Sequence, residues 1–99
     1  MDVGVGLLVF QLGGEIYAAD AKQVLEVGQA ARGLSRGRGL VFQSPDGLKT
    51  LPVDRIQGLE TARAEDLRKL PALVSAAAWA VGVWIRASGV VVLVDLAKM

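Results

Sequence analysis

Cysteine and histidine are both absent from the 99 residues of this chain. Their absence excludes a disulfide framework, metal sites with thiolate or imidazole ligands, and nucleophiles of the Cys–His or Ser–His–Asp kind. No serine is followed three residues later by lysine, and "GVGLLV" lacks the third glycine of a dinucleotide-binding loop. We therefore expect a protein that is not an enzyme and that uses neither a metal nor a cofactor.

A strong charge of either sign is also missing, because eleven basic and ten acidic residues leave a net charge of +1. This balance gives no field that draws a polyanion to the whole molecule. The first residues include an aspartate where a secretion signal needs basic side chains. The longest apolar stretch, Ala72 to Val94, is interrupted by Arg86. We expect a cytoplasmic protein that does not insert into a membrane.

Apolar residues are abundant, at 53% of the chain, and they lie in short runs between turns. Runs on either side of Gly13–Gly14, of Pro45–Gly47 and of Ala87–Gly89 predict three β-hairpins. The run Leu7–Leu12 is apolar at consecutive positions, which predicts a strand that is buried on both faces. Pro52 cannot donate a ladder hydrogen bond, so its strand should lie at a sheet edge or carry a bulge.

Two short helices are expected between these hairpins. Asp20 with Gln23 three residues later resembles a capping box, and Gly28 is a suitable stop, which predicts a helix of about two turns. Acidic residues followed by a proline predict a second short helix over Ala64–Pro71. With the hairpins, these helices make a mostly-β chain that we expect to form a small closed or nearly closed barrel.

The segment "RGLSRGRGL", Arg32 to Leu40, has neither a helical nor a strand period. Arginine offers a fork of hydrogen-bond donors and glycine lets a ligand approach the backbone, so Arg32, Arg36 and Arg38 are candidates for anion contact. No aromatic side chain is nearby to stack on bases, which favours a solvated loop. A small nucleic-acid-binding barrel that uses this loop is the alternative function.

The order of these segments resembles the CheW-like domain of bacterial chemosensory proteins. "LLVFQLGGEIYAADAKQVLEV" is similar to the opening of that domain, and "LVFQSPDGLKTLPVDRIQGLE" is similar to its later hairpin, which ends in Val53-Asp54. The last hairpin and Asp95-Leu96 follow in the family's order. The resemblance implies SH3- or OB-like β-barrels without catalysis. It also implies docking to the cytoplasmic tip of a chemoreceptor, to a CheA-type histidine kinase, to another CheW-like protein or to a second copy.

One segment of the family is missing. CheW-like domains usually carry a strand, an Asn-Leu-Arg-Gly turn and another strand where this chain has only Gln29–Arg38. The chain thus resembles a truncated member, with a hairpin-and-helix part (1–28), a Gly/Arg linker (29–38) and a second barrel portion (39–99). One barrel should be incomplete. Because open strand edges tend to be covered or to pair with another chain, we expect collapse toward one barrel or completion by a partner.

The resemblance also implies a partner-binding surface at the end of the first expected helix. Its residues are Val24, Leu25, Glu26 and Val27. Their spacing alone favours another interpretation, in which the apolar residues belong to the core and the glutamate is a solvated charge. The resemblance makes the two interpretations about equal.

Three further residues are candidates for partner binding. Asp54 and Arg55 either contact a partner or cap a strand end, and the second interpretation is favoured. Tryptophan is enriched at interface hot spots, and Trp79 and Trp84 fall on opposite faces of a strand. We expect one of the two to be exposed at a contact surface, and Trp84 is included among the partner-binding candidates.

Overall fold

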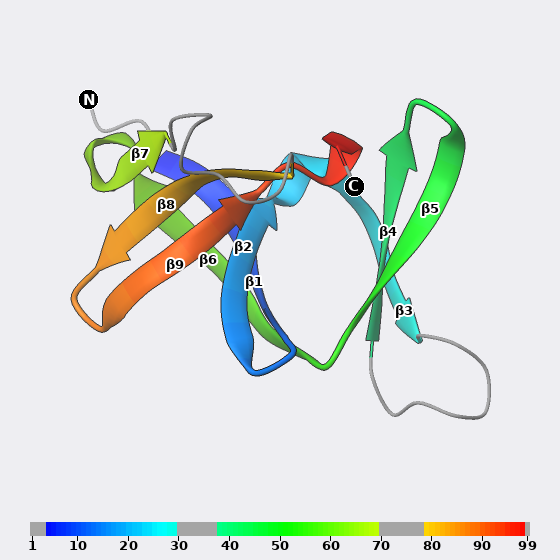
Figure 1. Cartoon of the computed structure of the whole chain (residues 1–99), viewed down its shortest axis with the longest axis horizontal. Helices are drawn as coiled ribbons and strands as arrows, with labels where there is room; N and C mark the ends of the chain where they lie inside the picture. The colour runs from blue at the N-terminus through cyan, green and yellow to red at the C-terminus, as the bar shows by residue number, and fades with distance from the viewer. Residues whose placement is uncertain (1–3, 30–37, 70–78, 99) are drawn as a thin grey trace.

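The computed structural model describes residues 4–29, 38–69 and 79–98, which form two β-sheets (Figure 1). The larger sheet has six strands in the order β6-β1-β2-β9-β8-β7 and the smaller has three in the order β3-β4-β5. In the larger sheet, β2 and β9 are parallel and the other neighbours are antiparallel. The predicted mostly-β class is confirmed.

The strands and short 3₁₀ turns follow one another along the chain as follows. The larger sheet contains β1 (Gly4–Leu12), β2 (Glu15–Asp20), β6 (Arg55–Arg63), β7 (Leu67–Lys69), β8 (Ala80–Arg86) and β9 (Gly89–Val94). The smaller sheet contains β3 (Val24–Gln29), β4 (Arg38–Ser44) and β5 (Gly47–Val53). The 3₁₀ turns are η1 (Ala21–Gln23), η2 (Ala64–Asp66) and η3 (Leu96–Lys98).

All three predicted hairpins are present, as β1–β2, β4–β5 and β8–β9. Gly13 and Gly14 have φ values of 61° and 85°, which suits the two-residue turn between β1 and β2. Pro52 lies on β5, which is an edge strand of the smaller sheet, as predicted.

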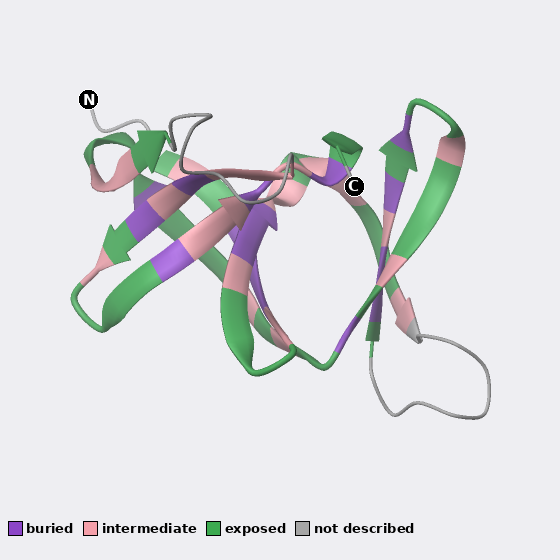
Figure 2. Cartoon of the chain, viewed as in Figure 1, coloured by how far each residue is buried: buried purple, intermediate pink, exposed green. Residues whose placement is uncertain are grey.

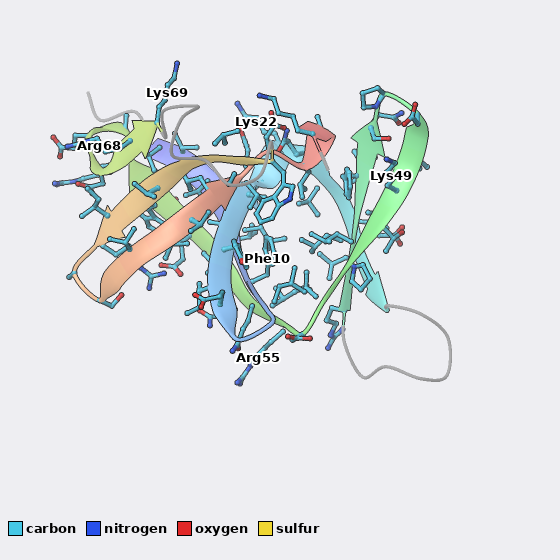
Figure 3. All side chains as sticks on the ribbon, viewed as in Figure 1. Phe10, Lys22, Lys49, Arg55, Arg68 and Lys69 are labelled. Atoms are coloured by element: carbon cyan, nitrogen blue, oxygen red, sulfur yellow. The ribbon has the colours of Figure 1, made fainter. Side chains whose placement is uncertain are left out.

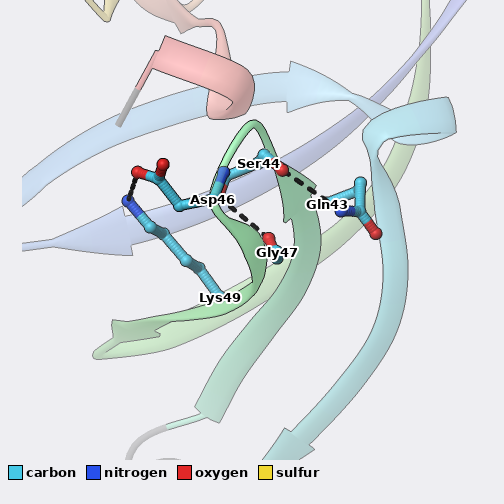
Figure 4. Close-up of polar contacts among 5 residues, drawn as sticks. All are labelled: Gln43, Ser44, Asp46, Gly47 and Lys49. Carbon is cyan, nitrogen blue, oxygen red and sulfur yellow. Dashed lines mark hydrogen bonds and ion pairs between the residues drawn. The ribbon is translucent and has the colours of Figure 1, made fainter.

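The turn between β4 and β5 is closed by a buried serine (Figure 4). The Ser44 hydroxyl donates a hydrogen bond to the Gly47 carbonyl at 2.8 Å and accepts one from the Asp46 N–H at 3.2 Å. The Asp46 carboxylate also lies 3.9 Å from the Lys49 ammonium. Both polar functions of the serine hydroxyl are therefore used inside the turn, which explains why this polar side chain is buried.

Both predicted helices are wrong. Residues 21–23 make one 3₁₀ turn, and Val24–Gln29 continue as strand β3. Ala64–Asp66 make another 3₁₀ turn, and Leu67–Lys69 continue as β7, which pairs with β8. In each case the residues after the first turn gain strand partners, and these tertiary contacts override the local helical signal.

The expected capping box is replaced by a contact with the C-terminal segment. Asp20 caps η1 through the Lys22 N–H at 2.9 Å, but Gln23 does not return to Asp20. The Gln23 side-chain amide instead donates to Asp95 Oδ1 at 2.7 Å and accepts from the Leu96 N–H at 3.1 Å. This side chain thus ties η1 to the start of η3.

The larger sheet curls so that its two ends approach each other. Ala62 on β6 and Trp84 on β8 stand near opposite ends of the strand order, yet they share one buried cluster with Val9. On the same side, the Arg86 guanidinium on β8 lies 3.6 Å from the Glu60 carboxylate on β6. Strands β6 and β7 are joined through η2 but do not pair, so the sheet is strongly curled rather than fully closed.

Strand β1 is buried on both of its faces. Leu7 and Val9 pack inside the curl, whereas Leu8 and Phe10 belong to a second core between the two sheets. This second core also contains buried residues of β4, including Phe42 (Figure 2). The prediction that consecutive apolar residues mark a doubly buried strand is confirmed.

The smaller sheet leaves its outer face in solvent. Its inner face carries Leu40 and Phe42, which are buried in the core between the sheets. Exposed residues on the outer face include Gln43, Leu48, Thr50 and Pro52. Because most of these are polar or proline, this face needs no further layer of strands. Among the described residues, β3 and β5 each pair with β4 and with no other strand.

Replacing Val9 or Phe10 by alanine tests the double burial of β1. We expect a loss of about 2 kcal/mol of unfolding free energy for Val9→Ala and about 3–5 kcal/mol for Phe10→Ala, because each change leaves a cavity in a different core. Urea unfolding followed by circular dichroism measures both. Leu48→Ala, at a side chain that is 66% exposed, is the control and should cost less than about 0.5 kcal/mol. An unchanged unfolding free energy in either Val9→Ala or Phe10→Ala would contradict the burial of β1 on both faces.

Candidate partner-binding groove

Strand β3 presents apolar side chains that the core does not use. Leu25 is 59% exposed and Val27 is 44% exposed, whereas Val24 packs partly against the core between the sheets. A bulge between Val24 and Glu26 interrupts the pairing with β4 and leaves Leu25 without a cross-strand partner. The structure therefore divides the predicted surface: Val24 is partly core, and the next three residues are exposed.

These residues line a hollow of about 280 Å³, which we call the apolar groove. Its lining residues are Leu8, Ala21, Val24, Leu25, Glu26, Val27 and Leu59. Leu59 comes from β6, pairs with Leu8 of β1 and is 72% exposed. The apolar groove thus lies between an edge strand of the smaller sheet and an edge strand of the larger one.

Leu59 was missed by the sequence reasoning. Nothing in the local pattern of its segment says which strand pairs with it. The antiparallel register of β6 on β1, with its shift between Val9 and Phe10, is what brings Leu59 opposite Leu8. A contact between segments about fifty residues apart cannot be inferred from strand periodicity, which is a local signal.

A second hollow of about 520 Å³ adjoins the first, and we call it the arginine groove. Its lining residues are Val27, Arg38, Asp54, Arg55 and Ile56. Val27 lines both hollows, so the two grooves meet at this residue. The structure therefore brings together candidates from three separate parts of the sequence. The Arg55 side chain points away from the body of the molecule (Figure 3).

Asp54 has a structural role at this site. Its carboxylate Oδ2 accepts a hydrogen bond from the Gly13 N–H at 2.8 Å, and its backbone N–H donates to the Gln11 carbonyl at 2.8 Å. Both contacts fasten the end of β5 to the β1–β2 hairpin. They favour the interpretation that Asp54 caps a strand end.

The tryptophans do not form a contact surface. Trp84 is 6% exposed and packs inside the curl of the larger sheet, with the Arg86 guanidinium 4.9 Å from its ring centroid. Trp79 is half-buried against the core between the sheets and meets the Tyr17 ring edge-on at 5.8 Å. The expectation of an exposed tryptophan is wrong, because Trp84 on β8 and Trp79 just before β8 pack against different cores.

The remaining expectations concern the Gly/Arg linker, metal sites and membrane insertion. Arg32 and Arg36 lie outside the described residues, as does most of the Gly/Arg linker, while Arg38 begins β4. Within the described ranges, no three metal-binding side chains lie together. No helix in those ranges has the length and apolar character needed to cross a membrane.

The fold and the groove together define the class of this protein, which is a two-sheet β-domain with an exposed apolar groove. Exposed apolar surfaces of this kind are typical of protein-binding sites. No protein-family model matches the chain. It is 37% identical to the Frizzy aggregation protein FrzB of Myxococcus xanthus over 102 residues, covering 93% of this chain and 91% of FrzB. Its fold matches the crystal structure of the scaffolding protein TtCheW from Thermoanaerobacter tengcongensis with a TM-score of 0.80 at 15% identity, over 94% of this chain and 90% of that one. The chain belongs to the CheW-like family.

Membership of this family carries a general function. Its relatives are scaffold and adaptor proteins of chemosensory signalling, and such proteins are in general not enzymes. The alignment covers nearly all of both chains, so FrzB is itself a short protein of similar length. The family assignment drawn from the ordered motifs of the sequence is confirmed.

Replacing Asp54 by alanine tests its structural role. We expect a loss of about 1 kcal/mol in unfolding free energy, because the Gly13 N–H loses its protein acceptor at a partly solvated site. Chemical unfolding measures this change. Asp46→Ala is the matched control, since that carboxylate makes only an exposed ion pair at 3.9 Å and should contribute less than about 0.5 kcal/mol. Equal stabilities for the two variants would contradict the fastening role.

Proposed function

We propose that this chain is a non-enzymatic adaptor of a bacterial chemosensory array, located in the cytoplasm, that binds the cytoplasmic tip of a chemoreceptor. The observation that carries the proposal is the convergence of Leu25, Glu26 and Val27 with Arg55 in two adjoining grooves. Leu25, Glu26 and Val27 belong to the stretch at which the CheW-like resemblance implies receptor contact, and Arg55 is a further candidate for partner binding. They come from separate parts of the chain and lie together on one exposed surface.

The apolar groove has the chemistry that such docking requires. Leu25, Val27 and Leu59 are exposed aliphatic side chains on strands, so they are held in place before a partner arrives. An amphipathic segment can lay its apolar face against them in the way that helices bind hydrophobic grooves. Full burial of one leucine side chain contributes about 1.5–3 kcal/mol, so these residues supply part of the binding free energy, and further contacts of the partner must offset the cost of association.

The missing segment limits the number of partners. A full CheW-like domain has a second complete barrel, whereas the smaller sheet here has three strands and a solvated outer face. We propose that the chain keeps the receptor contact and has lost the contact with the regulatory domain of the histidine kinase. It then acts as a variant or insulating adaptor that occupies receptors without recruiting the kinase.

A binding assay with two baits tests this function. The purified chain is presented to a chemoreceptor cytoplasmic fragment and to the kinase regulatory domain from the same organism, and biolayer interferometry records both. We expect binding to the receptor fragment without binding to the kinase domain. Tight independent binding to both would refute the one-sided adaptor, and binding to neither would refute receptor docking.

Replacing Leu25 by aspartate tests the apolar groove itself. We expect receptor binding to weaken by at least about tenfold, because a carboxylate replaces a side chain that must be buried against the partner. Leu48→Asp is the matched control, since Leu48 is similarly exposed on the same sheet, at 66% against 59% for Leu25, but lines neither groove. Both variants should unfold at the wild-type urea concentration within error. Equal losses of binding would mean that the groove is not the docking site.

A further inference from the structure

Two arginines stand at one end of the combined grooves without an ion pair. Arg38 begins β4 and Arg55 begins β6, and both are exposed and line the arginine groove. Within the described parts of the chain, neither guanidinium has a carboxylate within ion-pair distance. Two free guanidinium groups at one hollow form a local positive site in a chain whose net charge is +1.

The other described arginines are already engaged. Arg63 lies 3.0 Å from the Glu65 carboxylate, and Arg86 is held by Glu60 and by the face of the Trp84 ring. Arg68 donates hydrogen bonds to backbone carbonyls of its own turn. The two groove arginines therefore differ from the rest in having their donors available to a ligand.

Asp54 does not cancel this site. It is the acidic residue among the lining residues of the arginine groove, and one of its carboxylate oxygens is taken up by the Gly13 N–H. Among the lining residues that the structure describes, two cations and one anion give a net positive charge. A carboxylate brought by a partner gains an attraction here that it finds nowhere along the adjoining apolar groove.

The apolar groove has the opposite charge. Among its described lining residues, Glu26 is the charged one and the others have aliphatic side chains. The combined surface is thus negative beside Leu25 and positive beyond Val27. A charge pattern of this kind favours one direction of a bound segment over the other, because the reversed segment would bring like charges together.

We propose that Arg38 and Arg55 form a carboxylate-binding site that receives a glutamate or aspartate side chain of the docked partner segment and so sets its direction. The inference rests on the proposed docking function and specifies the chemistry of the partner. The segment carries apolar residues for the apolar groove, followed at one end by an acidic residue. Arginine suits this task because its planar fork can donate two parallel hydrogen bonds to one carboxylate.

Charge reversal with a charge-matched control tests the site. Arg38→Glu/Arg55→Glu is compared with Lys69→Glu/Lys98→Glu, which changes the net charge equally at exposed residues outside both grooves. In Figure 3, Lys69 lies at the top of the view and Arg55 at the bottom. The receptor fragment is titrated by biolayer interferometry at low and high salt. We expect about tenfold weaker binding for the arginine pair, mainly through slower association, and less than about twofold change for the control. Adding salt should reduce the difference in receptor-binding affinity between the wild type and the arginine variant.

Four outcomes separate this inference from the docking function. Equal losses in both charge-reversed variants would indicate a general field and would overturn the site. Unchanged binding by the arginine variant, together with loss in Leu25→Asp, would overturn the site and leave docking intact. Absence of wild-type binding would overturn docking and the site with it. Binding of single-stranded RNA that only the arginine variant loses, with a steep salt dependence, would reassign these arginines to nucleic acid.

Discussion

The double burial of β1 is the constraint on which the rest of this fold depends. Successive side chains of a strand point to opposite sides, so apolar residues at consecutive positions need a covering layer on each side. The curl of the larger sheet covers Leu7 and Val9, and the smaller sheet covers Leu8 and Phe10. The smaller sheet is therefore required, since without it half of β1 would face water.

The partner-binding surface follows from how the smaller sheet is placed. It covers the middle of β1, but its edge strand β3 stands beside β6 without pairing to it. The side chains on these two edges, Leu25, Val27 and Leu59, therefore remain between the sheets and in contact with water. An apolar groove of this kind is the normal consequence of two sheets that share a core and diverge at one edge. The outer face of the smaller sheet, in contrast, is mostly polar, which makes it a poor docking surface.

The sequence predicted the local elements well and the long-range ones poorly. The hairpins were recognised because turn residues such as Gly13 and Gly14 act within a few positions. The helices were wrong because Asp20 and Gln23 form an acceptable capping pattern, and the competing partners of Gln23 lie more than seventy residues away. The place of Leu59 in the groove and the burial of Trp84 also depend on contacts between distant segments, so the local pattern does not predict them. The family resemblance located most of the groove because it relies on ordered motifs and not on contacts.

Asp54 and Arg55 show how the fold and the groove are joined in adjacent residues. The carboxylate and the backbone N–H of Asp54 fasten the β1–β2 hairpin to the end of β5. That attachment lies directly before the start of β6, where Arg55 joins Arg38 among the lining residues of the arginine groove. Asp54 thus positions the strand end, and the next residue, Arg55, is left free for a ligand. A resemblance that covers both residues gives no way to tell these roles apart, whereas the hydrogen bonds of the folded chain do.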